Sequence, residues 1–261
     1  MKYGFIGCGN MGSAIARALS QKTKDIALTD RSGKAAELAN ELGYVYTDNN
    51  TIVSTCDRIF LAVKPQMMAE VLLPLQSILA DKKPLLISMA AGLSLSRIEE
   101  MAGTSLPIIR IMPNTPVSLG SGMTLFCHNQ LVDQTMLADF LTDVEPCGQW
   151  DLLEECLIDA AGVVSGCGPA YMYLFMDALA EGAMACGVPK QKALSYAAAT
   201  MIGAAKMVQN TGKTPEDLKN AVCSPGGSTI AGVRILESTG FQEAIINCVK
   251  AAYKRNQELG K

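Results

Sequence analysis

The sequence predicts a mostly parallel, doubly wound α/β domain over residues 1–151, followed by an all-α domain over residues 152–261. In the first part, short apolar runs alternate with helical patterns, which is typical of a parallel sheet with helices on both faces. A glycine-rich loop joins the first run to the first helical pattern. After Asp151 the strand-like runs stop, and helical segments rich in Ala, Gly and Met follow.

Apolar runs without polar alternation predict strands that are buried on both faces. The predicted strands are Tyr3–Ile6, Ile26–Thr29, Ile59–Val63, Leu85–Ser88, Ile108–Ile111, Met123–Cys127 and Gly148–Leu152. Between them, apolar residues at three-to-four spacing predict helices. These helices are Met11–Ser20, Lys34–Leu42, Met67–Leu79 and Ser96–Met101. Ser96 and Glu99 predict a capping box at the start of the last helix.

The second part consists of predicted helices, at Leu157–Val164, Ala170–Cys186, Lys190–Asn210, Pro215–Val222, Thr229–Ser238 and Phe241–Leu259. The helix Ala170–Cys186 is apolar around most of its circumference, so it needs cover on all sides. A domain of about 110 residues offers little such cover. We therefore expect a second subunit to supply it, in at least a homodimer.

The chain of 261 residues allows one large or two modest domains, at about 150 residues a domain. Hydrophobic residues make up 49% and charged residues 18%, so a core can form and an intrinsically disordered chain is excluded. The 22 basic and 25 acidic residues are nearly balanced and form no basic run. A nucleic acid partner is therefore not expected.

Nine cysteines stand at irregular spacings without a C-x-x-C pair, and we interpret them as reduced thiols of a cytoplasmic protein. His128, the one histidine, is expected at a strand end in a structural role, and no metal site is predicted. No apolar stretch has membrane-spanning length, and the first apolar run ends too early for a signal peptide. No membrane partner is expected.

A glycine loop, Gly7-Cys8-Gly9-Asn10-Met11-Gly12, follows the first predicted strand and opens the first predicted helix. This is the context that G-x-G-x-x-G requires in a Rossmann dinucleotide-binding domain. Gly7 would make the tight turn, Gly9 would let the backbone approach a pyrophosphate, and Gly12 would let the helix pack closely on the strand. The helix N-terminus would face the anion. An ordinary glycine-rich turn is the alternative.

Asp30 stands at the end of the second predicted strand, 18 residues after Gly12, where one residue selects between NAD and NADP. A carboxylate there would accept hydrogen bonds from the ribose hydroxyls of NAD and repel a 2′-phosphate. Arg31, Ser32 and Lys34 follow at once, and a guanidinium with a hydroxyl suits that phosphate. The two interpretations conflict, and we favour NADPH with NADH also accepted.

Three further segments follow predicted strands at the edge where open α/β sheets bind ligands. They are Ala62-Val63-Lys64-Pro65, Met89-Ala90-Ala91-Gly92 and Met112-Pro113-Asn114-Thr115-Pro116. Lys64 is either a cation in the cleft or a solvated loop lysine. The last segment is a rigid polar turn, and we expect Asn114 to contact the nicotinamide side.

A second loop, Cys223-Ser224-Pro225-Gly226-Gly227-Ser228-Thr229, joins two predicted helices. The proline and the paired glycines would expose successive amide N–H groups just before a helix that begins near Thr229. Such a nest suits a carboxylate by the same physics as a phosphate loop. A helix C-cap followed by an N-cap explains the same residues without a ligand.

The run from Val222 to Glu237 resembles the signature of pyrroline-5-carboxylate reductases. The resemblance extends along nearly the whole chain and includes Phe5–Gly12, Ala62–Pro65, Ala90–Gly92, Met112–Pro116, Gly168–Tyr171 and Gly203–Met207. Each motif is short, but their number and order are specific. The resemblance implies NAD(P)H-dependent reduction of 1-pyrroline-5-carboxylate to L-proline, the final step of proline biosynthesis. It also implies a helical C-terminal dimerisation domain and often larger rings of dimers.

The resemblance further implies the roles of individual residues. Thr229, the expected catalytic residue, would hydrogen-bond the ring nitrogen, and the loop amides would hold the substrate carboxylate. The expected substrate-binding residues are Glu155, Ser224, Gly226, Gly227, Ser228 and Thr229. The expected coenzyme-binding residues are Ile6, Gly7, Cys8, Gly9, Asn10, Met11, Gly12, Arg31, Ser32, Asn49, Ala62, Val63, Lys64, Pro65, Met89, Ala90, Ala91 and Asn114. Two positions depart from the family pattern, Asp30 beside the 2′-phosphate and Ala221, where some members carry a polar side chain.

A cyclic imine is electrophilic once protonated, so its reduction needs alignment and a polar contact to nitrogen more than a strong acid. A site without histidine suits this chemistry. The competing enzyme class is a β-hydroxyacid dehydrogenase or another imine reductase, with Lys206 and Asn210 on one helix face. That alternative leaves the Pro-Gly-Gly loop unexplained. A non-catalytic dinucleotide sensor is the other alternative.

Overall fold

The computed structural model describes residues 1–259, which form two compact units. The first unit comprises residues 1–167 together with the end of the last helix from Ala252, and the second comprises residues 168–251. The division thus falls between residues 167 and 168. The domain boundary that we expect after residue 151 stays a prediction.

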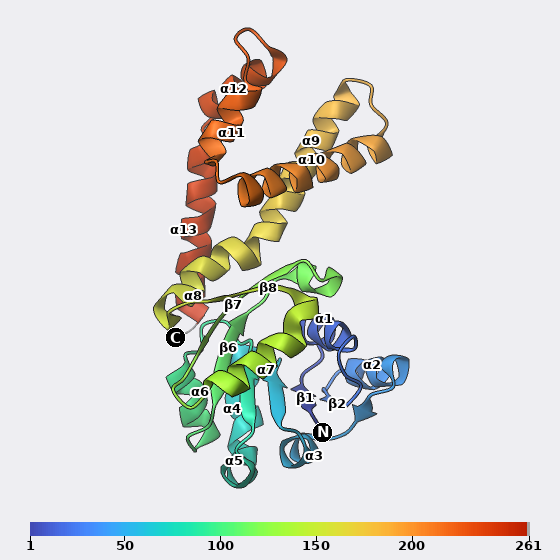
Figure 1. Cartoon of the computed structure of the whole chain (residues 1–261), viewed down its shortest axis with the longest axis vertical. Coiled ribbons are helices and arrows are strands. Elements are labelled where there is room, and N and C mark those ends of the chain that lie inside the picture. Colours follow the sequence, from blue (N-terminus) through green and yellow to red (C-terminus); the bar gives the residue numbers. More distant parts are fainter. Residues whose placement is uncertain (260–261) are drawn as a thin grey trace. The chain divides into compact units, whose positions relative to one another are not determined.

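One sheet of eight strands lies at the centre of the first unit, in the order β3-β2-β1-β4-β5-β6-β7-β8 (Figure 1). Neighbouring strands are parallel except β6 and β7, which confirms the mostly parallel α/β sheet. The strands are β1 (Tyr3–Ile6), β2 (Ile26–Thr29), β3 (Val45–Tyr46), β4 (Arg58–Leu61), β5 (Leu85–Ser88), β6 (Ile108–Met112), β7 (Gly122–His128) and β8 (Gly148–Leu152). The sequence predicts all of them except β3, which has two residues and carries no readable pattern. His128 ends β7, at the strand end where the sequence places it.

Helices connect these strands. They are α1 (Asn10–Leu19), α2 (Lys34–Leu42), α3 (Asn49–Thr55), α4 (Met68–Leu72), α5 (Gln76–Lys82), α6 (Leu95–Ala102), α7 (Gln134–Val144) and α8 (Glu155–Gly162), which continues into a π-helical turn over Val163–Cys167. Helices α3 and α7 are not among those that the sequence predicts. Both begin after an aspartate, Asp48 or Asp133, whose side chain accepts a hydrogen bond from a first-turn amide.

Two expectations about helices are wrong. Met67–Leu79 is not one helix, because Met67 ends a 3₁₀ turn that precedes α4 and a second 3₁₀ turn at Leu73–Leu75 separates α4 from α5. Pro74 lacks the amide hydrogen that an uninterrupted helix needs at that position. The capping box at Ser96 and Glu99 is also wrong, because α6 is capped by Ser94, whose hydroxyl accepts a hydrogen bond from the Arg97 amide at 3.2 Å.

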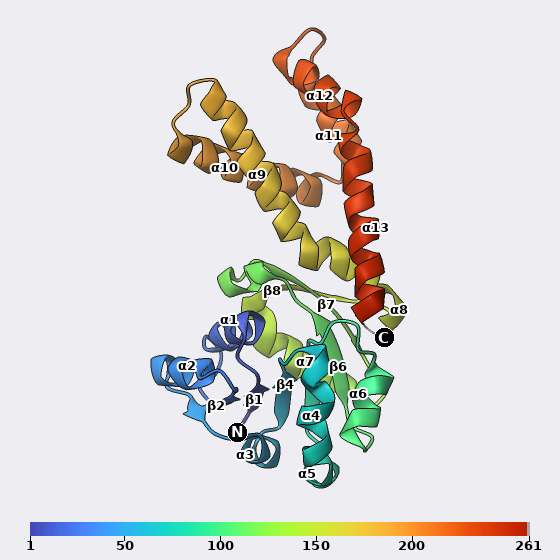
Figure 2. The ribbon, with the colours of Figure 1, turned by 180° about the vertical axis from the view of Figure 1, so that it is seen from behind.

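Both faces of the sheet are covered, as predicted from strands in which apolar and polar residues do not alternate. Figure 1 shows α7 in front of the sheet, and Figure 2, seen from behind, shows α4 in front. Consecutive residues of β4 belong to different cores, Phe60 to one and Ile59 with Leu61 to the other. In the first core, the rings of Phe5 and Phe60 stack with centroids 4.5 Å apart.

The second unit consists of helices and holds α9 (Gly168–Ala185), α10 (Lys190–Thr211), α11 (Pro215–Val222), α12 (Ser228–Ser238) and most of α13 (Phe241–Leu259). The helices predicted in the part of the chain after Asp151 are thereby confirmed. Large apolar side chains are exposed on several of these helices, Leu174 at 73%, Ile202 at 58% and Ile235 at 65%. This is the unburied apolar surface that the sequence leads us to expect. Among the described residues, no helix is both long and apolar enough to cross a membrane.

Candidate functional site

The glycine loop between β1 and α1 is shaped by close backbone contacts. Gly7 has φ +102°, and a Cβ there would lie 2.6 Å from the Ala62 carbonyl oxygen. A Cβ on Gly12 would lie 2.6 Å from the Gly7 carbonyl oxygen and 2.9 Å from the Ala62 side chain. Any larger residue at either position would push the loop away from the segment that follows β4.

Gly9 has a different role, because a Cβ at that position would meet nothing within 4 Å. It is the N-cap of α1 and has no side chain to accept hydrogen bonds from the first-turn amides. The first turn of α1 also contains no acidic residue. These amides and the positive end of the helix dipole are therefore available to an anion such as a pyrophosphate.

A cavity of about 750 Å³ opens beside this loop, at the carboxyl ends of β1, β2 and β4. Ten of the expected coenzyme residues line it: Ile6, Gly7, Cys8, Gly9, Arg31, Ser32, Asn49, Ala62, Val63 and Lys64. The other expected residues lie outside this cavity, and their coenzyme contacts stay predictions: Asn10, Met11, Gly12, Pro65, Met89, Ala90, Ala91 and Asn114. Burial, together with the charge of Asp30, raises the pKa of the Cys8 thiol to about 12, so this lining residue is uncharged. The volume and the loop fit a dinucleotide.

One wall of the cavity comes from residues 67–75, a segment for which the sequence predicts a helix but no contact with a coenzyme. Met67, Val71, Pro74 and Leu75 present apolar side chains, and Glu70 stands among them. An apolar wall of this kind suits the flat face of an adenine. The four-residue spacing from Met67 to Val71 is a signal in the sequence that indicates a shared face for these two side chains.

The loop after β2 holds the groups expected to select the coenzyme. Asp30 accepts a hydrogen bond from the Ser32 hydroxyl at 2.6 Å and another from the Gly33 amide at 3.0 Å. Arg31 donates to the Glu70 carboxylate, which reaches it from α4. Both side chains expected to bind a 2′-phosphate are therefore engaged by carboxylates.

The second glycine loop lies in the second unit. Gly227 donates its amide to the Ser224 carbonyl oxygen at 3.0 Å, and between them Pro225 is followed by Gly226 at φ +72°. A proline at the second position, a positive φ at the third and a hydrogen bond from the fourth residue to the first are typical of a type II turn. Gly227 is the N-cap of α12 and supplies no side-chain cap. The turn thus leaves the first amides of α12 available to a carboxylate, and exposed Thr229 stands in this first helical turn.

Glu155 lies in the first unit, at the start of α8. Its carboxylate accepts a hydrogen bond at 2.6 Å from the amide of Leu95, the first residue of α6. It also lies 3.6 Å from Arg110, which is 3% exposed and donates to Asp159 as well. Glu155 therefore has a structural role between two helices and β6, and its expected contact with the substrate stays a prediction.

Asn114 is buried, and the structure uses both ends of its side-chain amide. The amide nitrogen donates to the Ser165 carbonyl oxygen at 2.9 Å, and the amide oxygen accepts from the Met123 amide at 3.0 Å. These bonds fix the turn after β6 against β7 and the π-helical turn. The expected contact between Asn114 and the nicotinamide stays a prediction.

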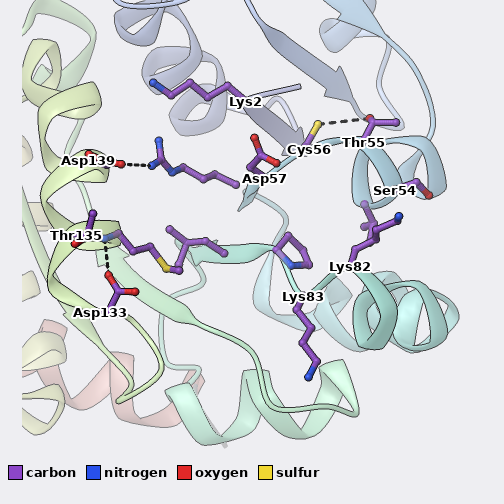
Figure 3. Close-up of a pocket in the computed structure, with 15 residues that line it drawn as sticks. Lys2, Ser54, Thr55, Cys56, Asp57, Lys82, Lys83, Asp133, Thr135 and Asp139 are labelled. Carbon is purple, nitrogen blue, oxygen red and sulfur yellow. Dashed lines mark hydrogen bonds and ion pairs between the residues drawn. The ribbon is translucent and has the colours of Figure 1, made fainter.

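A second cavity, of about 710 Å³, opens at the opposite, amino ends of β1, β4 and β5 (Figure 3). Its cations are largely paired: Lys2 with Asp143, and Arg58 with Asp143 and Asp139. Figure 3 marks the ion pair of Asp139 with Arg58 and the contact between Thr55 and Cys56. No glycine loop and no helix start without a side-chain cap lies here, so the first cavity is the candidate nucleotide site.

The described residues include no group of three His, Cys, Asp or Glu side chains placed to hold a metal ion. All nine cysteines, which lie within the described part, are free thiols.

Two known families match the chain. Residues 155–259 match the family described as pyrroline-5-carboxylate reductase dimerisation. Residues 2–92 match the family described as NADP oxidoreductase coenzyme F420-dependent. Together the two matches cover the loop-containing half of the sheet and the helices from α8 to α13.

Similar proteins match along the full chain. Pyrroline-5-carboxylate reductase of Escherichia coli is 38% identical over 266 residues, which cover 100% of this chain and 98% of the relative. The enzyme of the same name from Synechocystis is 39% identical over 267 residues, with 100% and 99% covered. The structure resembles pyrroline carboxylate reductase of Plasmodium falciparum with NADP bound, with a TM-score of 0.89, 31% identity and coverage of 100% and 98%.

Proposed function

This chain belongs to the pyrroline-5-carboxylate reductase family, and we propose on that basis that it reduces 1-pyrroline-5-carboxylate to L-proline with NAD(P)H, the final step of proline biosynthesis. One observation carries the proposal, the 38% identity that extends over 100% of the chain. Two further features support the proposal, a cavity with the volume for a dinucleotide and a turn that leaves a helix start free for a carboxylate.

The cavity beside the glycine loop is the proposed coenzyme site. NAD(P)H, when bound, supplies the hydride that reduces the C=N bond. The uncapped start of α1 holds the pyrophosphate, and the wall formed by Met67 and Val71 covers the adenine. Arg31 and Ser32 bind the 2′-phosphate of NADPH, and the NADP-bound relative supports this coenzyme.

The loop Ser224–Thr229 is the proposed substrate site. Amides at the start of α12 bind the carboxylate of the imine, because the turn at Gly226 and Gly227 leaves them without a side-chain cap. The Thr229 hydroxyl hydrogen-bonds the ring nitrogen, orients the C=N bond and relays a proton to it. Glu155 is a proposed neighbour of the substrate. Such a site works by alignment and by one polar contact, without a strong acid.

The helical domain matches a dimerisation family, so the protein forms an oligomer through it. We propose a homodimer that assembles further into a ring of dimers. The exposed apolar side chains of α9, α10 and α12 support an assembly of at least two chains. We also propose a cytoplasmic location, which the nine free thiols support because a reducing compartment keeps thiols reduced.

Steady-state oxidation of NADPH and of NADH tests the proposal, each with 1-pyrroline-5-carboxylate and with a 2-keto acid and a 3-oxo acid as controls. We expect oxidation of the reduced coenzyme with the imine only, and faster oxidation of NADPH than of NADH. Turnover with a control acid and none with the imine would overturn the proposed substrate. That result would favour the alternative in which Lys206 of α10 serves as the acid.

A further inference from the structure

Arg31 and Glu70 form an ion pair at the cavity beside the glycine loop. Arg31 extends from the loop after β2 and Glu70 from α4, and both line the cavity. Their side chains are 63% and 60% exposed, so each can also turn toward a ligand or toward water. Each group stabilises the charge of the other: the hydrogen bond raises the pKa of Arg31 and lowers that of Glu70.

We propose that Glu70 reduces the preference for NADPH over NADH by competing with the 2′-phosphate of NADPH for the guanidinium of Arg31. The inference rests on the proposed coenzyme site but not on the imine reaction. Arg31 is the only arginine that lines the cavity among the described residues. A guanidinium N–H that donates to a carboxylate is not available to a phosphate until that contact breaks, so Glu70 and a phosphate compete for the same donors of Arg31.

Glu70 affects the two coenzymes differently. NADPH carries a dianionic group that must displace Glu70 from Arg31 and then remain near the displaced carboxylate. NADH has a neutral hydroxyl at the same position, so it neither competes for Arg31 nor is repelled by Glu70. Glu70 therefore weakens NADPH binding selectively and brings the affinities for the two coenzymes closer together.

The second ligand of the phosphate is subject to a similar competition. The Ser32 hydroxyl donates to Asp30, which lies within the same loop. Asp30 also accepts from the Gly33 amide and so shapes the loop itself. Glu70 has no such second contact among the described residues, which makes it the residue whose charge can be removed without disturbing the loop.

The test is equilibrium titration of the full chain with NADPH, NADH, adenosine 2′,5′-bisphosphate and 5′-AMP, for wild type and for Glu70→Gln. We expect the substitution to tighten binding of the two 2′-phosphorylated ligands by about two- to fivefold, the range of one exposed ion pair. Binding of NADH and 5′-AMP should not change. Because such a pair is screened by salt, the gain should shrink as ionic strength rises.

Glu41→Gln is the matched control. Glu41 is 54% exposed and pairs with Arg17, and neither residue lines the cavity, so this variant removes the same charge elsewhere. It should bind all four ligands as wild type does. Adding Arg31→Ala to Glu70→Gln should abolish the gain.

Unchanged or weaker binding of the 2′-phosphorylated ligands by Glu70→Gln, or an equal gain for all four ligands, would overturn the proposal. Titration measures nucleotide binding alone, so these outcomes are independent of imine turnover. A chain that reduces no imine can still show the selective gain. A chain that reduces the imine and shows no gain disproves the role of Glu70 only.

Discussion

Thr229 carries the one side-chain contact that we propose to the reacting C=N group. It is exposed at the start of α12, one residue after the first helical residue. A hydroxyl can donate to or accept from the ring nitrogen, so one side chain serves the imine and the amine product. Because no histidine lines either proposed site, we expect this hydroxyl to account for most of the side-chain contribution to the step.

Replacing Thr229 by alanine should lower turnover with the imine by about tenfold to a thousandfold, the range for one lost acid–base or electrostatic contact. Steady-state oxidation of NADPH measures this effect. Thr229→Ser is the control and should keep most of the activity, because it retains the hydroxyl. Unchanged kinetics in the alanine variant would contradict the assignment.

Asp143 pairs with three side chains at the amino end of the sheet. It accepts hydrogen bonds from Lys2 at 2.9 Å, from Tyr3 at 2.7 Å and from Arg58 at 2.7 Å. Its side chain is 12% exposed and that of Arg58 is 13% exposed. The contacts tie α7 to β1 and β4, so the charge of Asp143 contributes to stability rather than to either proposed site.

Asp143→Asn should lower the free energy of unfolding by about 2–4 kcal/mol, because nearly buried Arg58 then keeps only its longer, 3.5 Å contact with the exposed carboxylate of Asp139. Urea unfolding at neutral pH measures the loss as a lower midpoint with an unchanged slope. The control is Glu100→Gln, which breaks the exposed pair with Arg97 and should change stability by about 0.5 kcal/mol or less.

The same carboxylate makes stability depend on pH. Burial raises the pKa of Asp143, but the hydrogen bonds from Lys2 and Tyr3 and the neighbouring positive charges outweigh it, so the pKa is below its ordinary value. The unfolded state therefore binds more protons, and this stabilisation is present above the ordinary carboxyl pKa and lost as pH falls through the lowered value. Between about pH 5 and pH 2, wild type should lose more stability than Asp143→Asn. Parallel losses would contradict the role of the charge.

At the scale of elements, two glycines of the loop between β1 and α1 have different roles, one in packing and one in the proposed binding of the coenzyme. Gly12 holds α1 against the residues after β4, whereas Gly9 faces open space at the start of the helix. The two glycines are three residues apart and belong to one motif, yet their surroundings differ completely. The effect of an added methyl group should therefore differ in kind between them.

Gly9→Ala should change the free energy of unfolding by less than about 1 kcal/mol, since its backbone angles are ordinary and the new Cβ meets no atom. It should weaken NADPH binding by about tenfold or more, because the methyl occupies the space proposed for the pyrophosphate. Gly12→Ala should instead cost about 1–3 kcal/mol of stability through overpacking. Urea unfolding and equilibrium titration measure the two effects, and equal behaviour of the two variants would contradict the distinction.

The elements also show what the sequence can predict. The strands are predictable because burial on both faces makes them continuous apolar runs, as in β1 and β5. Residues 67–79 wrongly suggest a single helix, because the apolar spacing continues across Pro74 whereas the helix ends before it. The two-residue strand β3 and the short, aspartate-capped helix α3 have weaker hydrophobic patterns in the sequence than the longer strands and helices.

The local shape of the candidate site is predictable where one segment builds it, as at the glycine loop and in the turn before α12, whereas the ligands of both loops stay predictions. The site is not predictable where distant elements meet, because pairing depends on tertiary geometry. The Arg31–Glu70 pair joins residues 39 positions apart, and the contact of Glu155 with the Leu95 amide joins residues 60 apart. Neither separation shows a pattern in one sequence.

At the scale of the whole molecule, the isolated chain leaves much apolar surface uncovered. On α9, Leu174 is 73% exposed and Tyr173 is 57% exposed, and both line a groove with Leu194 of α10. Burying such side chains stabilises an assembly by about 25 cal/mol for each Å² of apolar surface removed from water. Dimerisation is therefore an expected consequence of the helical unit, in line with the family that it matches.

Light scattering at micromolar concentration should show at least a dimer for wild type. Leu174→Glu should shift the distribution toward the monomer, because dimerisation would then bury an unpaired charge. Leu119→Glu is the matched control, since Leu119 is 84% exposed but lies in the first unit, and this variant should assemble as wild type does. A monomeric wild type, or equal dissociation of the two variants, would contradict the assignment of the interface to α9. Loss of assembly by Leu174→Glu alone would show that the apolar face of this helix is the surface that the second chain covers.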